Sequence, residues 1–179
     1  MSAWHISLRA HFNSRAATSD HERKRGGFNA WGNSFPREEL TFGEVIDVDQ
    51  IPFRLERDGT LDHLEAAGQC VELPRARASA LALLAFGEMG PQRIRIVMES
   101  DSDQHGLDVE AAGWLVDGTS QVERALDCTH LHYPGGYELA HLRPVMWPYV
   151  CDLPRQRNWR RLRIEANPLF HIAAATLLA

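Results

Sequence analysis

Hydrophobic and polar residues alternate with a period of two in several short segments of this chain. Near the middle, Ile94 and Ile96 fall on one face of an extended backbone, while Arg93 and Arg95 fall on the other. The segment 159–165 repeats the pattern, with leucine and isoleucine between arginines. This alternation predicts β-strands with one face in the core and one face in water.

Further short apolar segments stand between turn residues and extend the same prediction. We expect strands over residues 4–12, 44–48, 51–55, 69–73, 79–86, 109–116, 128–133, 145–151 and 169–178. Roughly ten short strands at a spacing of about 8–12 residues are typical of two stacked antiparallel sheets. The expected fold class is therefore all-β, an antiparallel jelly-roll β-sandwich that forms one domain over residues 1–179.

One apolar segment, ASALALLAF at 78–86, lacks the alternation and is rich in the helix formers alanine and leucine. It is short for a helix, because it begins soon after Pro74 and is followed directly by Gly87. A continuous apolar run of this length is typical of a strand that is covered on both faces. We therefore expect a buried central strand here.

Composition and charge limit the partners that this chain can have. It has 179 residues, of which 44% are hydrophobic, and this is enough to bury one core. Its formal charge is −5, from 24 acidic and 19 basic side chains. Since this charge would repel a phosphate backbone, no nucleic acid is expected as a partner. No segment approaches the roughly 20 apolar residues of a membrane span, so no membrane association is expected either.

The cysteines and the N-terminal segment suggest where the protein resides. Cys70, Cys128 and Cys151 are odd in number and have no CxxC spacing, which predicts neither a disulfide framework nor a zinc site. The first residues show no basic leader followed by an apolar run. We expect a cytoplasmic protein whose three thiols are small buried hydrophobes.

Five phrases in the first half of the chain arrive in an order that points to a known family. They are HFN at 11–13, GGFNAWGNSFPREEL at 26–40, IPFRL at 51–55, DHLEAAGQCVELP at 62–74 and ALALLAF at 80–86. Over residues 5–90 this order resembles an accessory domain of bacterial α-mannosidases and related glycoside hydrolases. The resemblance implies a galactose-binding-like β-sandwich that binds carbohydrate, sometimes with a structural calcium ion. The segment 130–148 has no place in that pattern.

The loop FNAWGNSF at 28–35 is the first candidate for a ligand site. Trp31 is flanked by Asn29, Asn33 and Ser34, so that a stacking plane is surrounded by short amide and hydroxyl groups. A sugar ring needs this combination, because its C–H face stacks on an indole while its hydroxyls require polar partners. Tyr133 is a further candidate contact. The alternative is that the loop caps the sandwich and its amides satisfy turn backbones.

A histidine cluster in the segment 130–148 is the second candidate. On a strand, His130 and His132 point to the same face, and Glu138 and His141 follow within a few residues. These four residues could bind a metal ion, since imidazole and carboxylate are common ligands. Alternatively, the histidines act as acid and base on a bound small molecule, or one is a core residue and the others lie on the surface.

Three acidic residues, Asp58, Asp62 and Glu65, could supply oxygen ligands for calcium, although turn formation is the commoner role of such residues.

The sequence contains no GxGxxG, Walker, HExxH or GxSxG motif. Three hypotheses remain open: a stand-alone protein that binds a sugar or a glycosylated small molecule, a small-molecule biosynthetic enzyme that uses the histidines, and an interaction protein that self-associates, for example as a homodimer.

Overall fold

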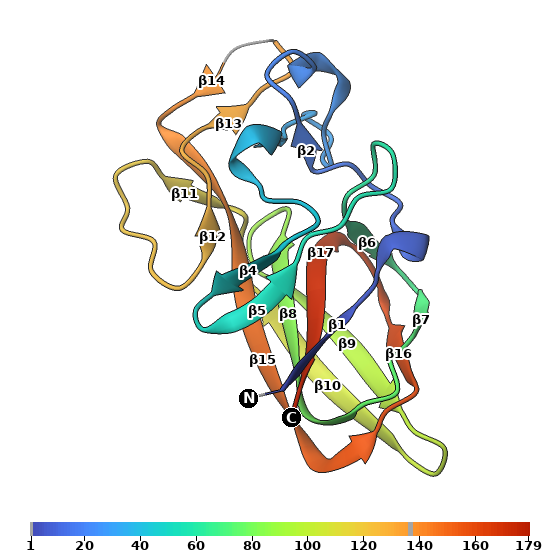
Figure 1. The fold of residues 1–179 in the computed structure, drawn as a ribbon. Helices are drawn as coiled ribbons and strands as arrows, with labels where there is room; N and C mark the ends of the chain where they lie inside the picture. Colours follow the sequence, from blue (N-terminus) through green and yellow to red (C-terminus); the bar gives the residue numbers. More distant parts are fainter. Residues whose placement is uncertain (1, 136–137) are drawn as a thin grey trace.

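Two antiparallel sheets stack to form the body of the protein (Figure 1), and the computed structural model describes residues 2–135 and 138–179. The first sheet has the order β1-β17-β8-β15-β11, with β6 beside β17 and β12 beside β15. The second has the order β10-β9-β16-β7. All pairings within these two sheets are antiparallel, so the expected all-β antiparallel sandwich is confirmed.

The strands of the first sheet are β1 (Ala3–Ile6), β6 (Leu64–Ala67), β8 (Arg77–Gly87), β11 (Leu115–Asp117), β12 (Leu126–Asp127), β15 (Leu142–Asn158) and β17 (Ala166–Leu178). Those of the second are β7 (Cys70–Glu72), β9 (Gln92–Glu99), β10 (Gln104–Ala111) and β16 (Arg161–Ile164). Three smaller pairs join β2 (Ala17–Thr18) with β3 (Phe35–Pro36), β4 (Val45–Val48) with β5 (Ile51–Arg54), and β13 (Leu131–His132) with β14 (Glu138–Leu139). Short 3₁₀ turns lie at Arg9–His11, Arg23–Arg25 and Arg37–Glu39.

Strand β8 lies between β17 and β15 and is buried on both faces, which confirms the prediction of a central strand. Leu81 and Leu83 face the second sheet and belong to the core between the two sheets. Leu84 and Phe86 face the opposite way, into a second core beneath the loops. The absence of alternation in this segment therefore reflects three layers, with the central sheet covered on either side.

The second core positions the candidate functional residues. Its aromatic centre consists of Phe28, Phe35, Phe86 and Trp114, with ring centroids 4.7–6.0 Å apart. Phe28 and Phe35 stand at the two ends of the loop that was expected to bind a ligand. Their burial therefore fixes both ends of this loop on the outer face of the central sheet, and the residues between them are held above that face.

Three strand predictions were wrong in their extent, and one of them, over residues 128–133, is a strand only at β13. The segment 4–12 forms a strand only over β1, because a 3₁₀ turn follows at Arg9–His11. The segment 109–116 contains the end of β10 and the start of β11, which belong to different sheets. The chain crosses between the sheets at Ala112 and Gly113, where Gly113 forms a bridge with Gly87. Residues 109–116 therefore cannot form one continuous strand of a single sheet.

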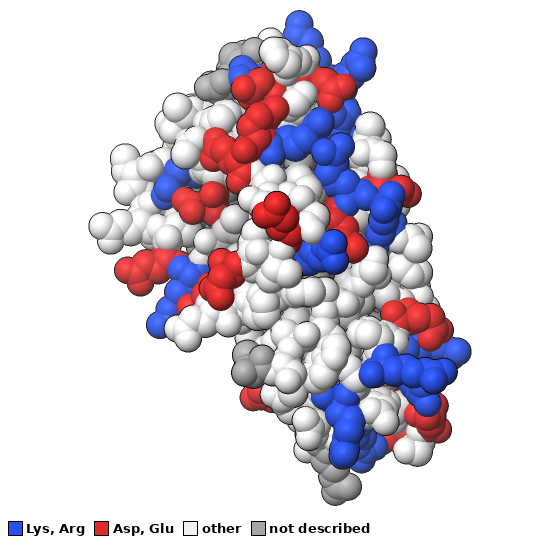
Figure 2. Space-filling model, viewed as in Figure 1, with Lys and Arg blue, Asp and Glu red and all other residues white. Residues whose placement is uncertain are grey.

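The outer faces carry charges of both signs. Figure 2 shows acidic and basic side chains together in the upper part and at the lower right, with uncharged surface between them. On β16, Arg161 pairs with Glu72 and Arg163 with Glu99, while Leu162 and Ile164 are buried, as the alternation predicted. Among residues 2–135 and 138–179 every helix is a short 3₁₀ turn, and none has the length or apolar content of a membrane span.

The cysteines differ from one another. Cys128 is buried and Cys151 is half-buried, but Cys70 is exposed at the start of β7. The expectation that all three thiols are buried was therefore wrong for Cys70. On this short strand Val71 takes the inward position, so that both neighbouring side chains point to solvent.

Candidate functional site

A pocket of about 410 Å³ opens at one end of the loop layer. Its lining consists of Trp31, Asn33, Glu88, Met89, Gly90, Gly113, Trp114 and Leu115. Three of these side chains are large, apolar and exposed: Trp31 to 50%, Met89 to 58% and Leu115 to 36%. Exposed apolar side chains that gather in one hollow mark a binding site more strongly than the same residues scattered over the surface.

The loop over the pocket is shaped by its own polar residues. The Asn29 Oδ1 atom accepts hydrogen bonds from the backbone N–H groups of Trp31 at 3.1 Å and Asn33 at 3.0 Å. Asn29 Nδ2 donates to the Asn33 side chain at 3.3 Å. Because these bonds satisfy the turn backbone, the Trp31 indole is left to project into the pocket lining rather than into the core.

Glu88 lies at the end of β8 and lines the same pocket, with its side chain only 10% exposed. Burial raises the pKa of this carboxyl group, and the negative charge of Glu65 adds to the effect. A hydrogen bond from the backbone N–H of Ala30 opposes the shift without reversing it. Glu88 therefore favours its protonated form more than an exposed glutamate does.

A chain of polar side chains runs through the second core and ends at Glu88. It begins at Asp62, which is 5% exposed and accepts hydrogen bonds from the backbone N–H groups of Ala16 at 2.7 Å and Ala17 at 2.9 Å. His63 Nδ1 lies 3.0 Å from the same carboxylate. Asp62 thus has three hydrogen-bond partners, which fix the orientation of its side chain in the core.

The chain continues through two buried imidazoles. His63 Nε2 lies 3.0 Å from His171 Nδ1, and His171 Nε2 lies 3.7 Å from Glu88 Oε2. The His171 ring is stacked on Phe86 with centroids 4.9 Å apart, and Phe28 meets the edge of both imidazoles. Burial lowers the pKa of His171 to about 2, and the adjacent His63 adds to this shift.

These contacts fix the direction of the hydrogen bonds. The Asp62 carboxylate accepts from His63 Nδ1, and a His63 ring that carries a single proton there presents a lone pair at Nε2. His171 must then donate from Nδ1, which leaves a lone pair at its own Nε2 facing Glu88. Two acceptors facing each other would repel, so this arrangement favours a protonated Glu88.

A second polar cluster lies beside β13. His132 is fully buried, and its Nδ1 atom lies 2.9 Å from Thr18 Oγ1, which in turn lies 2.6 Å from Ser34 Oγ. Its Nε2 atom lies 3.2 Å from His130 Nε2 and 3.2 Å from Asp20 Oδ1. Burial lowers the pKa of His132, and nearby positive charge acts in the same direction. His132 is therefore a neutral imidazole with a carboxylate and a second imidazole at one nitrogen.

The structure separates the expected ligand-binding residues into two groups. Trp31 and Asn33 line the pocket, and Asn29 supports them from within the loop. The Ser34 hydroxyl instead contacts Thr18, and the Ser34 backbone pairs with that of His132. Tyr133 is half-buried beside the second cluster, in the turn after β13.

The expected metal ligands are also divided. His130 and His132 lie together, as their spacing predicted, and Asp20 is the carboxylate that joins them. His141 is exposed and lies near Asp117 instead. The backbone of Glu138 forms part of β14, but its side chain lies outside the described part of the structure.

The expected calcium ligands have other contacts. Both oxygens of Asp62 accept backbone N–H groups, while the exposed Asp58 pairs with Arg9 at 3.3 Å. A structural calcium ion stays a prediction.

Sequence reasoning missed Glu88, His63, His171 and Asp20. His171 could have revealed the buried polar residues from the sequence. A histidine within the apolar run of the last strand must be buried and therefore needs a buried hydrogen-bond partner. Glu88 gives no such signal, because it follows a strand and precedes a turn, where an exposed glutamate is equally expected.

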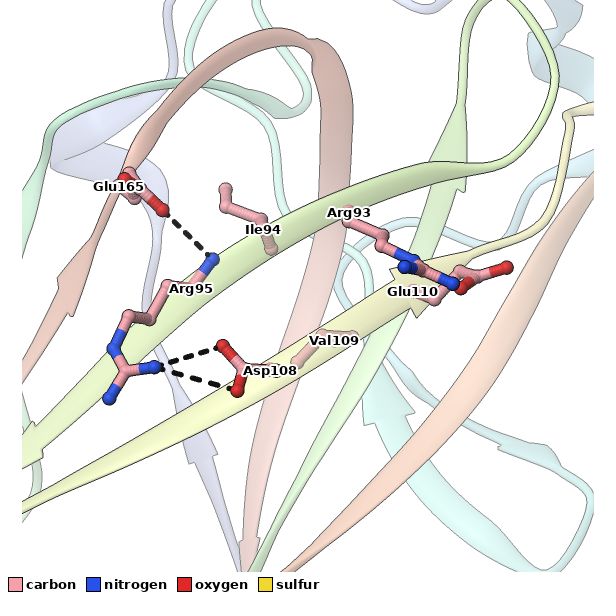
Figure 3. A pocket seen from close by; sticks show the side chains of 7 residues that line it. All are labelled: Arg93, Ile94, Arg95, Asp108, Val109, Glu110 and Glu165. Atoms are coloured by element: carbon pink, nitrogen blue, oxygen red, sulfur yellow. Dashed lines mark hydrogen bonds and ion pairs between the residues drawn. The ribbon is translucent and has the colours of Figure 1, made fainter.

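A larger hollow of about 570 Å³ lies on the outer face of β9 and β10. In Figure 3, Arg95 reaches Asp108, and its backbone N–H faces Glu165. Arg93 pairs with Glu110 across the same two strands at 2.5 Å. The charged groups that line this hollow are thus paired with one another on an exposed sheet face. Such surface ion pairs are common on sheets and do not by themselves indicate a binding site.

The fold and the two clusters define a β-sandwich protein whose candidate functional groups lie in a loop layer on one outer face of the central sheet. The family model described as AziU2-like beta-sandwich domain matches residues 2–179. The chain belongs to this family, and the match agrees with the sandwich that the mannosidase resemblance implied, without showing a link to those accessory domains. No curated protein matches the chain.

Proposed function

We propose that this protein binds a small organic molecule, either a sugar or a glycosylated compound, in the pocket beneath Trp31. The single observation that carries the proposal is the pairing, in one hollow, of an exposed indole with the Glu88 carboxyl group, whose pKa is raised by burial. Its volume of about 410 Å³ is within the range of about 300–1,000 Å³ that is typical of small-molecule sites.

The lining supports a ligand that is apolar on one face and polar at its edges. Trp31, Met89 and Leu115 offer apolar surface that a ring could cover. Trp114 is buried, with its Nε1 atom donating to the backbone oxygen of Glu88 at 3.0 Å, so it forms a rigid wall rather than a mobile contact. A protonated Glu88 can donate a hydrogen bond to a ligand oxygen. Stacking and donation together suit a sugar ring.

Binding can be tested by titrating the purified protein with free monosaccharides and with p-nitrophenyl glycosides, followed by calorimetry. We expect at least one of these probes to bind and Trp31→Ala to weaken its binding by about 1–3 kcal/mol, because the stacking surface is lost. The melting temperature should hardly change. Val45→Ala removes an equally exposed apolar side chain that is not among the pocket-lining residues, and it should leave the affinity unchanged.

Two outcomes would contradict the proposal. In one, no probe of either type binds the wild-type protein. In the other, a probe binds equally well to Trp31→Ala and the wild type, which would place its site elsewhere. If Trp31→Ala instead converts a dimer to a monomer, the exposed apolar residues serve self-association.

The buried chain from Asp62 to Glu88 favours a second candidate function at the same pocket, namely acid catalysis on the bound molecule. A glutamate that is held protonated beside a ligand can act as a general acid. In this step the Glu88 O–H bond breaks and the proton moves to the glycosidic oxygen of the ligand as the bond from this oxygen to the anomeric carbon breaks. Water forms the new bond to that carbon, and the proton that it loses returns through solvent to the Glu88 carboxylate.

Glu88→Gln separates the two functions. The amide keeps a neutral hydrogen-bond donor of similar shape but has no proton to transfer. If Glu88 is catalytic, the variant should bind a p-nitrophenyl glycoside with an affinity near that of the wild type and release p-nitrophenolate at least 100-fold more slowly. If the wild type binds the probe and leaves it intact, catalysis on this substrate class is excluded and binding remains.

A further inference from the structure

We infer that Asp20, His130 and His132 form a binding site for a divalent transition-metal ion of the zinc type. One oxygen and two imidazole nitrogens from these residues lie within 4.8 Å of one another. Asp20 comes from the loop after β2, whereas the two histidines come from the region of β13. The fold therefore brings together ligands that are distant in sequence, and this site is separate from the pocket of the proposed function.

Two of the three distances between the donor atoms match those of a tetrahedral metal site, and the third is at most 4.8 Å. Zinc lies about 2.0–2.1 Å from imidazole nitrogen and about 2.0–2.2 Å from carboxylate oxygen, so neighbouring ligands on a tetrahedral ion stand about 3.3–3.5 Å apart. The observed separations are 3.2 Å between His130 Nε2 and His132 Nε2, and 3.2 Å between His132 Nε2 and Asp20 Oδ1. Small side-chain shifts would suffice to seat an ion.

The far side of the His130 ring is held in the way that metal-binding histidines require. His130 Nδ1 lies 2.9 Å from Glu39 Oε1. The same carboxylate accepts the Thr129 backbone N–H and hydroxyl, each at 2.6 Å. Because Glu39 accepts, His130 carries its proton on Nδ1 and presents the Nε2 lone pair to His132 and Asp20. A carboxylate behind a ligating histidine is the usual outer partner of a zinc ligand.

His132 is oriented by hydroxyl groups instead. Its Nδ1 atom lies 2.9 Å from Thr18 Oγ1, and Thr18 can accept from this nitrogen while donating to Ser34 Oγ at 2.6 Å. This arrangement places the His132 lone pair on Nε2, where the other two donors converge. A single proton at that nitrogen could satisfy only one of its two neighbours, whereas a metal ion satisfies all three at once.

The site is accessible from solvent, because the Asp20 side chain is 49% exposed and that of His130 is 18% exposed. Three protein ligands leave a fourth tetrahedral position for water or a bound molecule, as in catalytic zinc sites. Arg23 also contacts Asp20 Oδ1, at 3.3 Å, and its positive charge competes with a cation for this oxygen.

The test uses the protein of residues 1–179 after treatment with a chelator. Zn²⁺ and Co²⁺ serve as probes in equilibrium dialysis, and Co²⁺ also in absorption spectroscopy. We expect about one equivalent of either ion and the absorption of tetrahedral Co²⁺. Asp20→Asn and His130→Asn should each weaken binding at least 10-fold. Glu39→Gln should weaken it about 10-fold without removing a ligand. Arg23→Gln should strengthen it several-fold.

His141→Asn is the matched control, because it removes an exposed histidine of the same region that is not part of the cluster. It should leave affinity and spectrum unchanged. Binding of less than a tenth of an equivalent by the wild type would overturn the inference. So would an affinity that survives both Asp20→Asn and His130→Asn in proteins whose circular dichroism matches the wild type. Neither result bears on the pocket beneath Trp31, which is tested with organic probes.

Discussion

His171 and Glu88 face each other through their Nε2 and Oε2 atoms at 3.7 Å, and His171 Nε2 has no closer hydrogen-bond partner among the described residues. The two groups have pKa values shifted in opposite directions, downward for the imidazole and upward for the carboxyl group. Both shifts favour a neutral pair. The pair is therefore expected to make the stability of the fold depend on pH in two ways.

The first dependence comes from His171. Its pKa is about 2 in the folded protein and about 6.5 in the unfolded chain. The unfolded state binds a proton below pH 6.5 while the folded state does not, so the stabilisation is present above this pH and is lost as the pH falls toward 2. Between pH 7 and pH 5 we expect the free energy of unfolding to fall by about 2 kcal/mol.

Urea unfolding at pH 7 and pH 5 measures this loss. His171→Asn cannot take up a proton at this position, so its dependence on pH should be flatter than that of the wild type by most of this amount, whatever its overall stability. His141→Asn, at an exposed position, should keep the wild-type dependence. An unchanged dependence in His171→Asn would show that this imidazole is not the responsible group.

The second dependence comes from Glu88 and has the opposite sign. Its folded pKa is raised above the reference value of 4.5, so its contribution is fully present below pH 4.5 and is lost as the pH rises through the folded value. Glu88→Gln is neutral at every pH. The stability of this variant relative to the wild type should therefore increase from pH 4 to pH 8 in urea titrations. A constant difference across this range would mean that the pKa of this carboxyl group is the same in the folded and unfolded states.

How much of the fold and of the candidate site could be predicted from the sequence depends on the surroundings of each residue. The alternation around Ile94 and Leu162 predicted strands correctly, because one face of each strand is wet. The loop with Trp31 was found because an indole among amides is conspicuous. Asp20 could not be found, because a carboxylate in a charged loop resembles any solvated one. Its role depends on the packing of that loop against β13, which no local pattern encodes.

Asp62 is a second residue whose surroundings could not be predicted from the local sequence. It also gives the next prediction, on the stability of the fold. Sequence favoured a turn or calcium residue, but the structure places it in the core, where its oxygens accept the backbone N–H groups of Ala16 and Ala17. Asp62→Asn turns one acceptor into a donor that faces another donor. We expect a loss of about 2–3 kcal/mol in the free energy of unfolding.

The matched control for Asp62→Asn is Asp58→Asn. This carboxylate is exposed and pairs with Arg9 at the surface, so its loss should change the free energy of unfolding by less than about 0.5 kcal/mol. If the two variants proved equally stable in urea titrations at pH 7, the buried hydrogen bonds of Asp62 would contribute nothing measurable.

The last prediction concerns the support of the pocket loop. Gly27 has a φ of +130°, and a Cβ atom at this position would lie 2.2 Å from the Cα atom of Gly32 on the opposite side of the loop. Gly27→Ala should therefore destabilise the protein by at least about 2 kcal/mol and displace Trp31 from the pocket. Gly43 also has a positive φ, of +86°, but a Cβ there meets nothing within 4 Å. Gly43→Ala should cost only about 1 kcal/mol, from backbone strain alone. Urea unfolding measures the loss in the free energy of unfolding for each variant. Titration with a p-nitrophenyl glycoside that the wild type binds should show weaker binding for Gly27→Ala alone. Equal effects of the two substitutions would show that the close approach of Gly27 to Gly32 does not hold the loop in place.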